Sequence, residues 1–242
     1  MGATVAEDSS RIYGEGDPDM PEEFRDLLTR MLVHHMENST NPHYTELLDK
    51  LWSRGMALIP DEKFKVTYAR LMQQEVEHGV ITARILAGLG VGPVDTEIKQ
   101  YMFHLPLDTF CDLAFFNALG DRVGCYIGET WEGVPYEPLL NVADRLHKDE
   151  VFHATFGMNN LRRICSTEEG RAQANEKVGI WWPAALDMFG NSSSSFSDKY
   201  VKWNLRKKNN EELRQAYIAD TRPMLEQIGI DVPDDAANRR FL

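Results

Sequence analysis

The sequence predicts an all-α protein organised as a four-helix bundle, with additional helices towards the C-terminus. Two segments indicate the bundle, Glu75-Val76-Glu77-His78 and Glu150-Val151-Phe152-His153. Each places a carboxylate and an imidazole three residues apart, so that both lie on one face of an α-helix, about one turn apart. Glu-x-x-His on two helices is the pattern with which four-helix bundles hold a pair of iron or manganese ions, while each of the other two helices supplies one more carboxylate. No stretch of the chain shows the alternation of apolar and polar residues that is typical of strands.

Length and composition restrict the class of protein. At 242 residues, of which 43% are apolar, the chain can bury a sizeable core and is expected to be folded. Its formal net charge of −12 argues against a nucleic-acid partner or an anionic membrane surface. No apolar run approaches the roughly 18 residues of a membrane-spanning helix, and the N-terminus lacks the basic and apolar regions of a signal peptide. Three cysteines without a CxxC pair are typical of a reduced, cytoplasmic protein.

The N-terminal part is expected to precede the bundle. Residues 1–20 contain glycines, a proline and several acids, and we expect a flexible arm there, followed by a single domain over residues 21–242. A first helix is expected from Glu22 to about Glu37, because its apolar residues recur with a helical period and acids stand at its start, where the helix dipole favours them. The sequence Asn38-Ser39-Thr40-Asn41-Pro42 then interrupts the helix.

Two helical hairpins form the predicted bundle, and each turns at a proline, Pro60 in the first and Pro135 in the second. The first hairpin begins with Asn41 as the N-cap and Pro42 in the first helical position. Glycines after residue 88 end its second helix. The four expected helices span residues 42–58, 62–89, 107–132 and 137–164.

Further helices are expected after the bundle. The sequence Ser166-Thr167-Glu168-Glu169 is typical of a capping box, and it predicts a helix that continues to Trp181-Trp182-Pro183. Asn191 and the serines at 192–195 predict a polar loop. A last helix is expected over about residues 211–228.

The pattern requires two more carboxylates, one on each of the other two helices. They can be located by their depth, which is the distance along the helix from the turn, because ligands on the two helices of a hairpin should lie equally far from its turn. Glu75 lies about 15 residues after Pro60 and Glu46 about 14 residues before it, which places both about 21 to 23 Å from the turn at the helical rise of about 1.5 Å per residue. In the second hairpin, Glu150 lies about 15 residues after the proline and Asp121 about 14 residues before it, at the same depth. Both halves therefore repeat one layout.

Three other acids fit this layout less well. Glu129 is too close to its turn to meet Glu150, and Glu77 points about 200° away from Glu75 around the helix. Glu37 precedes Pro60 by a much longer stretch than Glu46 does, and it lies beyond a helix break. Depth thus favours Glu46 over Glu37, but the choice between them stays open.

The candidate metal centre therefore contains four carboxylates and two imidazoles. Oxygen ligands with two histidines suit iron or manganese, whereas a site without thiolates does not suit structural zinc. The predicted catalytic and metal-ligating residues are Glu46, Glu75, His78, Asp121, Glu150 and His153.

Three segments are shared with a known family: Gln73–Gly79, Lys148–His153 and Trp181–Gly190. Together they resemble the catalytic oxygenase subunit of the multicomponent phenylacetyl-CoA epoxidase, in the phenylacetic acid catabolic protein family. The resemblance covers roughly residues 21–234. The Trp-Trp-Pro segment is the more specific part, because the metal motif alone is compatible with any ferritin-like protein.

The resemblance implies a ferritin-like fold with a di-iron centre that activates O2 and epoxidises or hydroxylates an aromatic substrate, an aryl-acyl-CoA such as phenylacetyl-CoA. Electrons would come from a separate NAD(P)H-dependent reductase, because the chain carries no GxGxxG motif and no four-cysteine cluster. A ferritin-like structural subunit is a further implied partner, and manganese is the alternative to iron. The family's ligands fall on Glu75, His78, Asp121, Glu150, His153 and, after about seven extra residues, Glu46.

Two alternatives stay open at this point. Leu71 stands where the family subunit tends to carry a lysine, one turn before the first motif, and this favours a stand-alone di-iron oxygenase acting on a substrate without CoA. The second alternative is a non-catalytic ferritin-like scaffold or a metal-handling protein. Because all six predicted positions carry side chains that can bind a metal, the sequence favours an enzyme.

Overall fold

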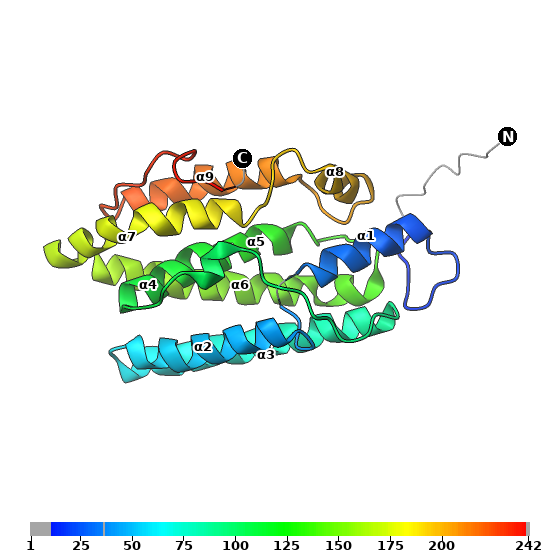
Figure 1. Ribbon diagram of the computed structural model, residues 1–242, viewed down its shortest axis with the longest axis horizontal. Coiled ribbons are helices and arrows are strands. Elements are labelled where there is room, and N and C mark those ends of the chain that lie inside the picture. Colours follow the sequence, from blue (N-terminus) through cyan, green and yellow to red (C-terminus); the bar gives the residue numbers. More distant parts are fainter. Residues whose placement is uncertain (1–10, 36, 241–242) are drawn as a thin grey trace.

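The computed structural model describes residues 11–35 and 37–240, and the named elements within them are all helices. This confirms the predicted all-α class with a bundle and additional C-terminal helices. Figure 1 shows three layers: α2 and α3 on one side, α4, α5 and α6 in the middle, and α7, α8 and α9 on the other side. The elements are α1 (Glu22–Val33), α2 (Pro42–Leu58), α3 (Glu62–Gly88), η1 (Tyr101–His104), α4 (Phe110–Phe115), η2 (Phe116–Asp121), α5 (Arg122–Glu129), α6 (Glu137–Ile164), α7 (Glu168–Asp187), α8 (Ser195–Lys202) and α9 (Asn210–Glu226).

The two helices of the first hairpin begin where side chains cap free backbone N–H groups. The side chain of Asn41 accepts a hydrogen bond from the backbone N–H of His43 at the start of α2. At the start of α3, Asp61 accepts one from the backbone of Lys63 in the same way. These caps, with the prolines beside them, fix α2 and α3 at the predicted positions, and α6 also begins and ends as predicted.

The third bundle helix differs from the single helix predicted over 107–132. It consists of α4, the π-helical turn η2 and α5, and it begins at a capping box formed by Thr109 and Asp112. A π-helical turn inside an α-helix is rare and is frequently found at functional sites. The widened turn lies against α6 at Gly157, where a Cβ atom would approach the backbone nitrogen of Ala118 to 2.1 Å. Only glycine leaves room for this contact.

The N-terminal prediction is corrected in part. Residues 1–10 of the predicted arm lie outside the described residues, but residues 11–20 are held against the bundle. The backbone N–H of Tyr13 donates to the carbonyl of Pro135, and the backbone N–H of Glu137 donates to the carbonyl of Tyr13. Met20 is buried. Helix α1 then ends at Val33, so that Glu37 lies in the connection to α2 rather than in the helix.

The C-terminal helices cover one face of the bundle (Figure 1). Helix α7 continues through Pro183, and it buries Trp181 and Trp182 completely. Part of the predicted polar loop is helical, because α8 begins at Ser195. Within the described residues, none of the helices combines the length and the apolar character that crossing a membrane requires.

Candidate metal centre

Four of the predicted residues meet between α3 and α6. Glu75 and His78 come from α3, while Glu150 and His153 come from α6, and all four side chains are buried. Ligand atoms of Glu75, Glu150 and His153 lie within 4.8 Å of one another. A second group with the same spacing consists of Glu37, Glu75 and His78. Glu75 belongs to both groups, so its carboxylate could contribute to the binding of two ions.

Both imidazole rings direct Nδ1 towards the carboxylates. Nδ1 of His78 lies 3.3 Å from Oε2 of Glu37 and 3.5 Å from Oε1 of Glu150, while Nδ1 of His153 lies 3.1 Å from Oε1 of Glu75. Both rings are fully buried, yet neither Nδ1 makes a hydrogen bond of acceptable geometry. A buried polar atom without a partner is costly. The two unpaired nitrogens therefore fit a metal ion as their missing partner.

The other ring nitrogens are held by residues that precede the two glutamates. Nε2 of His78 lies 3.2 Å from a carboxylate oxygen of Asp149, and Nε2 of His153 lies 3.1 Å from the amide oxygen of Gln74. The amide nitrogen of Gln74 in turn donates to Asp149. Each helix thus holds the histidine of the other. With a proton on Nε2, the lone pair of each Nδ1 points at the carboxylates, as metal binding requires.

The electrostatics of the cluster fit a cation. Burial raises the pKa of Glu150 to about 7, although the nearby imidazole of His78 opposes the shift. For His78, burial is outweighed by the carboxylates of Glu150 and Glu37, and its pKa rises to about 12. The pKa of His153 rises to about 9 because Glu75 outweighs burial in the same way. Without a metal the cluster retains protons, and a divalent cation would displace them on binding.

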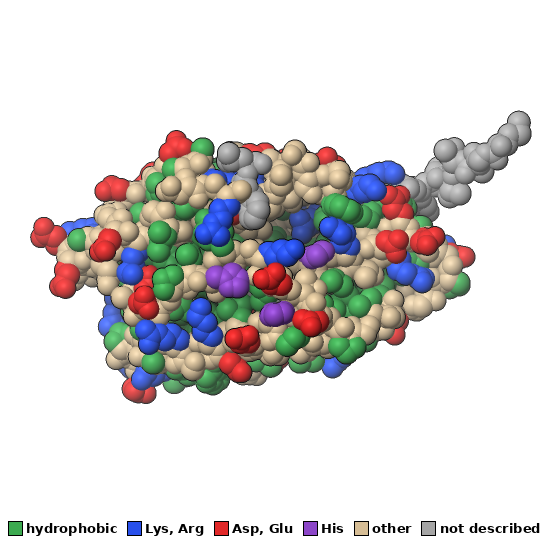
Figure 2. Space-filling view, in the orientation of Figure 1, with side chains coloured by type: hydrophobic (Ala, Val, Ile, Leu, Met, Phe, Trp, Pro, Cys, Tyr) green, Lys and Arg blue, Asp and Glu red, His purple; other side chains and the backbone are tan. Residues whose placement is uncertain are grey.

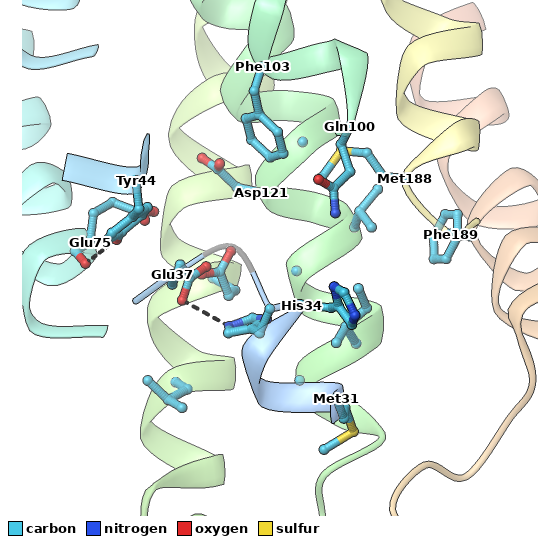
Figure 3. Close-up of a pocket in the computed structure, with 18 of the residues that line it drawn as sticks. Met31, His34, Glu37, Tyr44, Glu75, Gln100, Phe103, Asp121, Met188 and Phe189 are labelled. Carbon is cyan, nitrogen blue, oxygen red and sulfur yellow. Dashed lines mark hydrogen bonds and ion pairs between the residues drawn. The ribbon is translucent and has the colours of Figure 1, made fainter. Parts of the chain in front are cut away.

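Asp121, the predicted ligand from the third bundle helix, lies at the end of the π-helical turn. It lines the same cavity as Glu37 and Glu75 (Figure 3). Asn117, one turn earlier, donates a hydrogen bond of 2.9 Å to its carboxylate. Burial raises the pKa of Asp121 well above its usual value, and the nearby carboxylate of Glu150 acts in the same direction. Asp121 is not part of either close group of ligand atoms, so its role as a ligand stays a prediction.

Glu46, the predicted ligand from the first hairpin, does not reach the cluster. Its side chain is exposed on α2, and the residue that α2 directs inward is Tyr44, whose hydroxyl donates to the backbone carbonyl of Glu75 at 2.6 Å. The depth along α2 is as expected, but two residues after an inward position the helix has turned about 200°, to the opposite face. The connection after α1 brings in Glu37 instead, which pairs with His35 and faces the cavity (Figure 3). The sequence-based choice of Glu46 over Glu37 is therefore corrected.

A cavity of about 310 Å³ leads from the carboxylates to the surface. Its inner wall is largely apolar and includes Phe103, Phe116 and Leu71. Figure 3 shows Met188 and Phe189 on the side opposite the acids, so the C-terminal segment after α7 closes the cavity from that direction. The volume and the apolar lining with a few polar groups are typical of a small-molecule site.

Removing the carboxylate that holds His78 is expected to weaken metal binding without removing a ligand. Asp149→Ala should lower iron affinity about 10- to 100-fold, because the imidazole loses the partner that orients it. Competition with a chelator measures the change. Asp144→Ala is the matched control, since Asp144 is an exposed acid on the same helix that pairs with Lys148. Equal affinities of the two variants would contradict the role assigned to Asp149.

Comparisons with known proteins add to this geometry. A family model described as "phenylacetic acid catabolic protein" matches residues 96–240, a range that includes Asp121, Glu150 and His153. The chain is also similar to the A subunit of the 1,2-phenylacetyl-CoA epoxidase of Escherichia coli (strain K12). The two are 24% identical over 228 residues, which cover 89% of this chain and 71% of the relative.

Proposed function

The chain belongs to the phenylacetic acid catabolic protein family, and from this premise we propose that it is a di-iron monooxygenase that oxygenates an aromatic substrate, a CoA thioester such as phenylacetyl-CoA. The observation that carries the proposal is the pair of buried Nδ1 atoms, in His78 and His153, that lack a hydrogen-bond partner beside three carboxylates. The family assignment agrees with the resemblance described from the sequence. The named activity of the E. coli relative supports the substrate class.

The residues present fit two iron ions, with manganese as the alternative. In the proposal, Glu37 and His78 hold one ion, Glu150 and His153 hold the other, and Glu75 is shared. Asp121 faces the same cavity and is proposed as the sixth ligand. Two ferrous ions would supply the reductive activation of O2, which no amino-acid side chain provides.

The protein's own contribution is to orient the ligands, exclude water and position the substrate. Asp149 and Gln74 fix the two imidazole rings, as described above. Phe103 and Phe116 offer the aromatic ring of a substrate an apolar wall that ends at the carboxylates. We propose that electrons come from a separate NAD(P)H-dependent reductase. The relative is named as one subunit of its enzyme, which supports a partner protein here as well.

The test begins with anaerobic reconstitution of the purified chain. About two irons per chain are expected, with an ultraviolet–visible spectrum that changes on exposure to oxygen. With a reductase and phenylacetyl-CoA, O2 consumption and an oxygenated product are expected. A content well below two irons per chain would overturn the di-iron assignment, and tight iron binding without substrate-dependent O2 consumption would favour a metal-handling protein.

The corrected ligand leads to a paired prediction. Glu37→Gln is expected to lower the iron content below two per chain, because the amide removes a negative charge within 3.3 Å of Nδ1 of His78. Glu46→Gln, the same chemical change on exposed α2, is expected to leave the iron content unchanged. Metal analysis after desalting measures both. The reverse result would mean that the connection after α1 moves away and that α2 supplies the ligand.

A stand-alone oxygenase that acts on a substrate without CoA is the second candidate. The observation that favours it is Leu71, which lines the cavity at the position where the family subunit tends to carry a lysine. Parallel turnover assays with phenylacetyl-CoA and free phenylacetate separate the two candidates.

A further inference from the structure

We propose that Arg206 and Arg30, both near Tyr200, form a subsite that binds an oxyanion of the substrate in the cavity. The subsite presupposes the proposed function, because it assumes that the cavity holds the substrate. Arg206, Arg30 and Tyr200 all line the cavity that leads to the carboxylate cluster. We call these three residues the guanidinium subsite.

Arg206 lacks the carboxylate partner that some other buried arginines of the chain have. Arg214 pairs with Glu211, and Arg239 pairs with Asp187. Among the described residues, Arg206 forms no ion pair. Its Nη1 donates to the side-chain oxygen of Asn210 at 3.3 Å, and its buried Nε has no acceptor. In a chain with a net charge of −12, carboxylates are abundant, so a guanidinium kept away from them is available to a ligand.

Tyr200 brings the second guanidinium to the same place. The carbon at the centre of the Arg206 guanidinium lies 5.1 Å from the centre of the Tyr200 ring. Burial raises the pKa of Tyr200, while Arg206 and Arg30 both oppose the shift, Arg30 through a hydrogen bond as well. Both positive charges are therefore close to one phenol. Arg30 is exposed while Arg206 is partly buried, and an anion bound between the two like charges would offset their repulsion.

The rest of the cavity wall agrees with an anionic ligand at this end. The acids that line the cavity are Glu37, Glu75, Asp121 and Glu150, and all of them belong to the carboxylate end. Figure 2 shows Lys, Arg and His side chains, with Asp or Glu side chains among them, near a hollow in the middle of the visible face. In the proposal, a ligand in the cavity meets positive charge at the guanidinium subsite and carboxylates at the metal centre.

This separation of charge would orient the substrate. The carboxylates repel an anionic group, so the uncharged ring points towards them and the anion stays at the guanidinium subsite. An arginine presents its N–H groups as a fork that matches the oxygens of a phosphate or a carboxylate. The shared chemistry is an oxyanion, which can be a phosphate of a coenzyme thioester or the carboxylate of a free aromatic acid. Two guanidinium groups favour the more highly charged phosphate.

Binding of three probes to the purified protein tests the subsite. The probes are phenylacetyl-CoA, the uncharged thioester phenylacetyl-N-acetylcysteamine, and phenylacetate. Arg206→Gln is expected to raise the Kd of phenylacetyl-CoA about 10- to 100-fold and to reduce its dependence on salt, while the Kd of the uncharged thioester changes less than about two-fold. If Kd rises for phenylacetate instead, the oxyanion is a carboxylate. Lys207→Gln, the same loss of charge at the exposed neighbouring residue, is expected to change no Kd.

Other outcomes would overturn the subsite. Equal losses for the charged and uncharged thioesters would mean that Arg206 only supports the fold, and no loss for any probe would mean that it only packs against Tyr200. Failure of the unsubstituted protein to bind any of the probes would also reject it. Iron content and melting temperature, measured on the same samples, separate these results from failure of the proposed function, because probe binding is measured independently of metal loading.

Discussion

Replacing Glu75 by glutamine is expected to reduce bound iron from about two ions per chain to less than one and to abolish O2-dependent turnover. Glu75 is the one residue that lies in both close groups of ligand atoms, so its loss affects both ions at once. Glutamine keeps the size of the side chain but removes the charge, and its amide nitrogen cannot bind a metal as a carboxylate does. Metal analysis after anaerobic reconstitution, together with product formation, measures the effect.

Glu77→Gln is the matched control for this change. Glu77 is two residues further along α3, at the surface, where it pairs with Arg145, and its replacement should leave iron content and turnover unchanged. The helix content of both variants should equal that of the unsubstituted protein by circular dichroism. A Glu75→Gln variant that still holds two ions would show that the centre is elsewhere.

Replacing Gly157 by alanine is expected to lower the free energy of unfolding by about 3 kcal/mol. The new Cβ atom would lie 2.1 Å from the backbone nitrogen of Ala118 and 2.5 Å from the carbonyl carbon of Asn117. These are backbone atoms, so no side-chain rotation relieves the overlap, and α6 has to move away from the π-helical turn. A decrease in melting temperature of roughly 6 to 12 °C is expected for a chain of this size.

Gly179→Ala provides the control, because a Cβ atom there meets no atom within 4 Å. In the interior of α7, alanine is expected to stabilise the protein by up to about 1 kcal/mol through its higher helix propensity. The two substitutions therefore change stability in opposite directions. If both variants melted at the same temperature, the close contact between α6 and the π-helical turn would not exist in solution.

The part of the site that lies on regular helices could be predicted from the sequence. Proline, N-caps and helical periodicity define α2, α3 and α6. The Glu-x-x-His spacing places Glu75 and His78 on one face of α3, and Glu150 and His153 on one face of α6. Because Glu75 and Glu150 lie equally far from the turns of their hairpins, the two motifs meet at the same depth in the bundle. Depth depends only on the rise per residue, which varies little between helices. The structure brings these four residues together on two long, uninterrupted helices, and their role as metal ligands stays a prediction.

Whether the remaining candidate ligands reach the site depends on the direction in which their side chains point. Counting residues from the turn gives the depth of a residue but not this direction. The buried residues Tyr44, Leu47 and Leu51 mark the inward face of α2, and this apolar stripe could have shown that Glu46 points outward. No periodic signal places Glu37, because the described residues between α1 and α2 are not helical. No periodic signal places the guanidinium subsite either, because its arginines are far apart in the sequence and meet only through the packing of α8 against α1.

The π-helical turn η2 also constrains the length of the chain. A π-turn contains one more residue than the α-turn that it replaces. Deleting a single residue between Phe116 and Asp121 would convert the π-helical turn into an ordinary α-turn, which leaves α4 and α5 in nearly the same relative rotation. The backbone at Asn117 and Ala118 that meets Gly157 would be displaced instead. The number of residues in this turn should therefore stay fixed, because it sets the contact with α6.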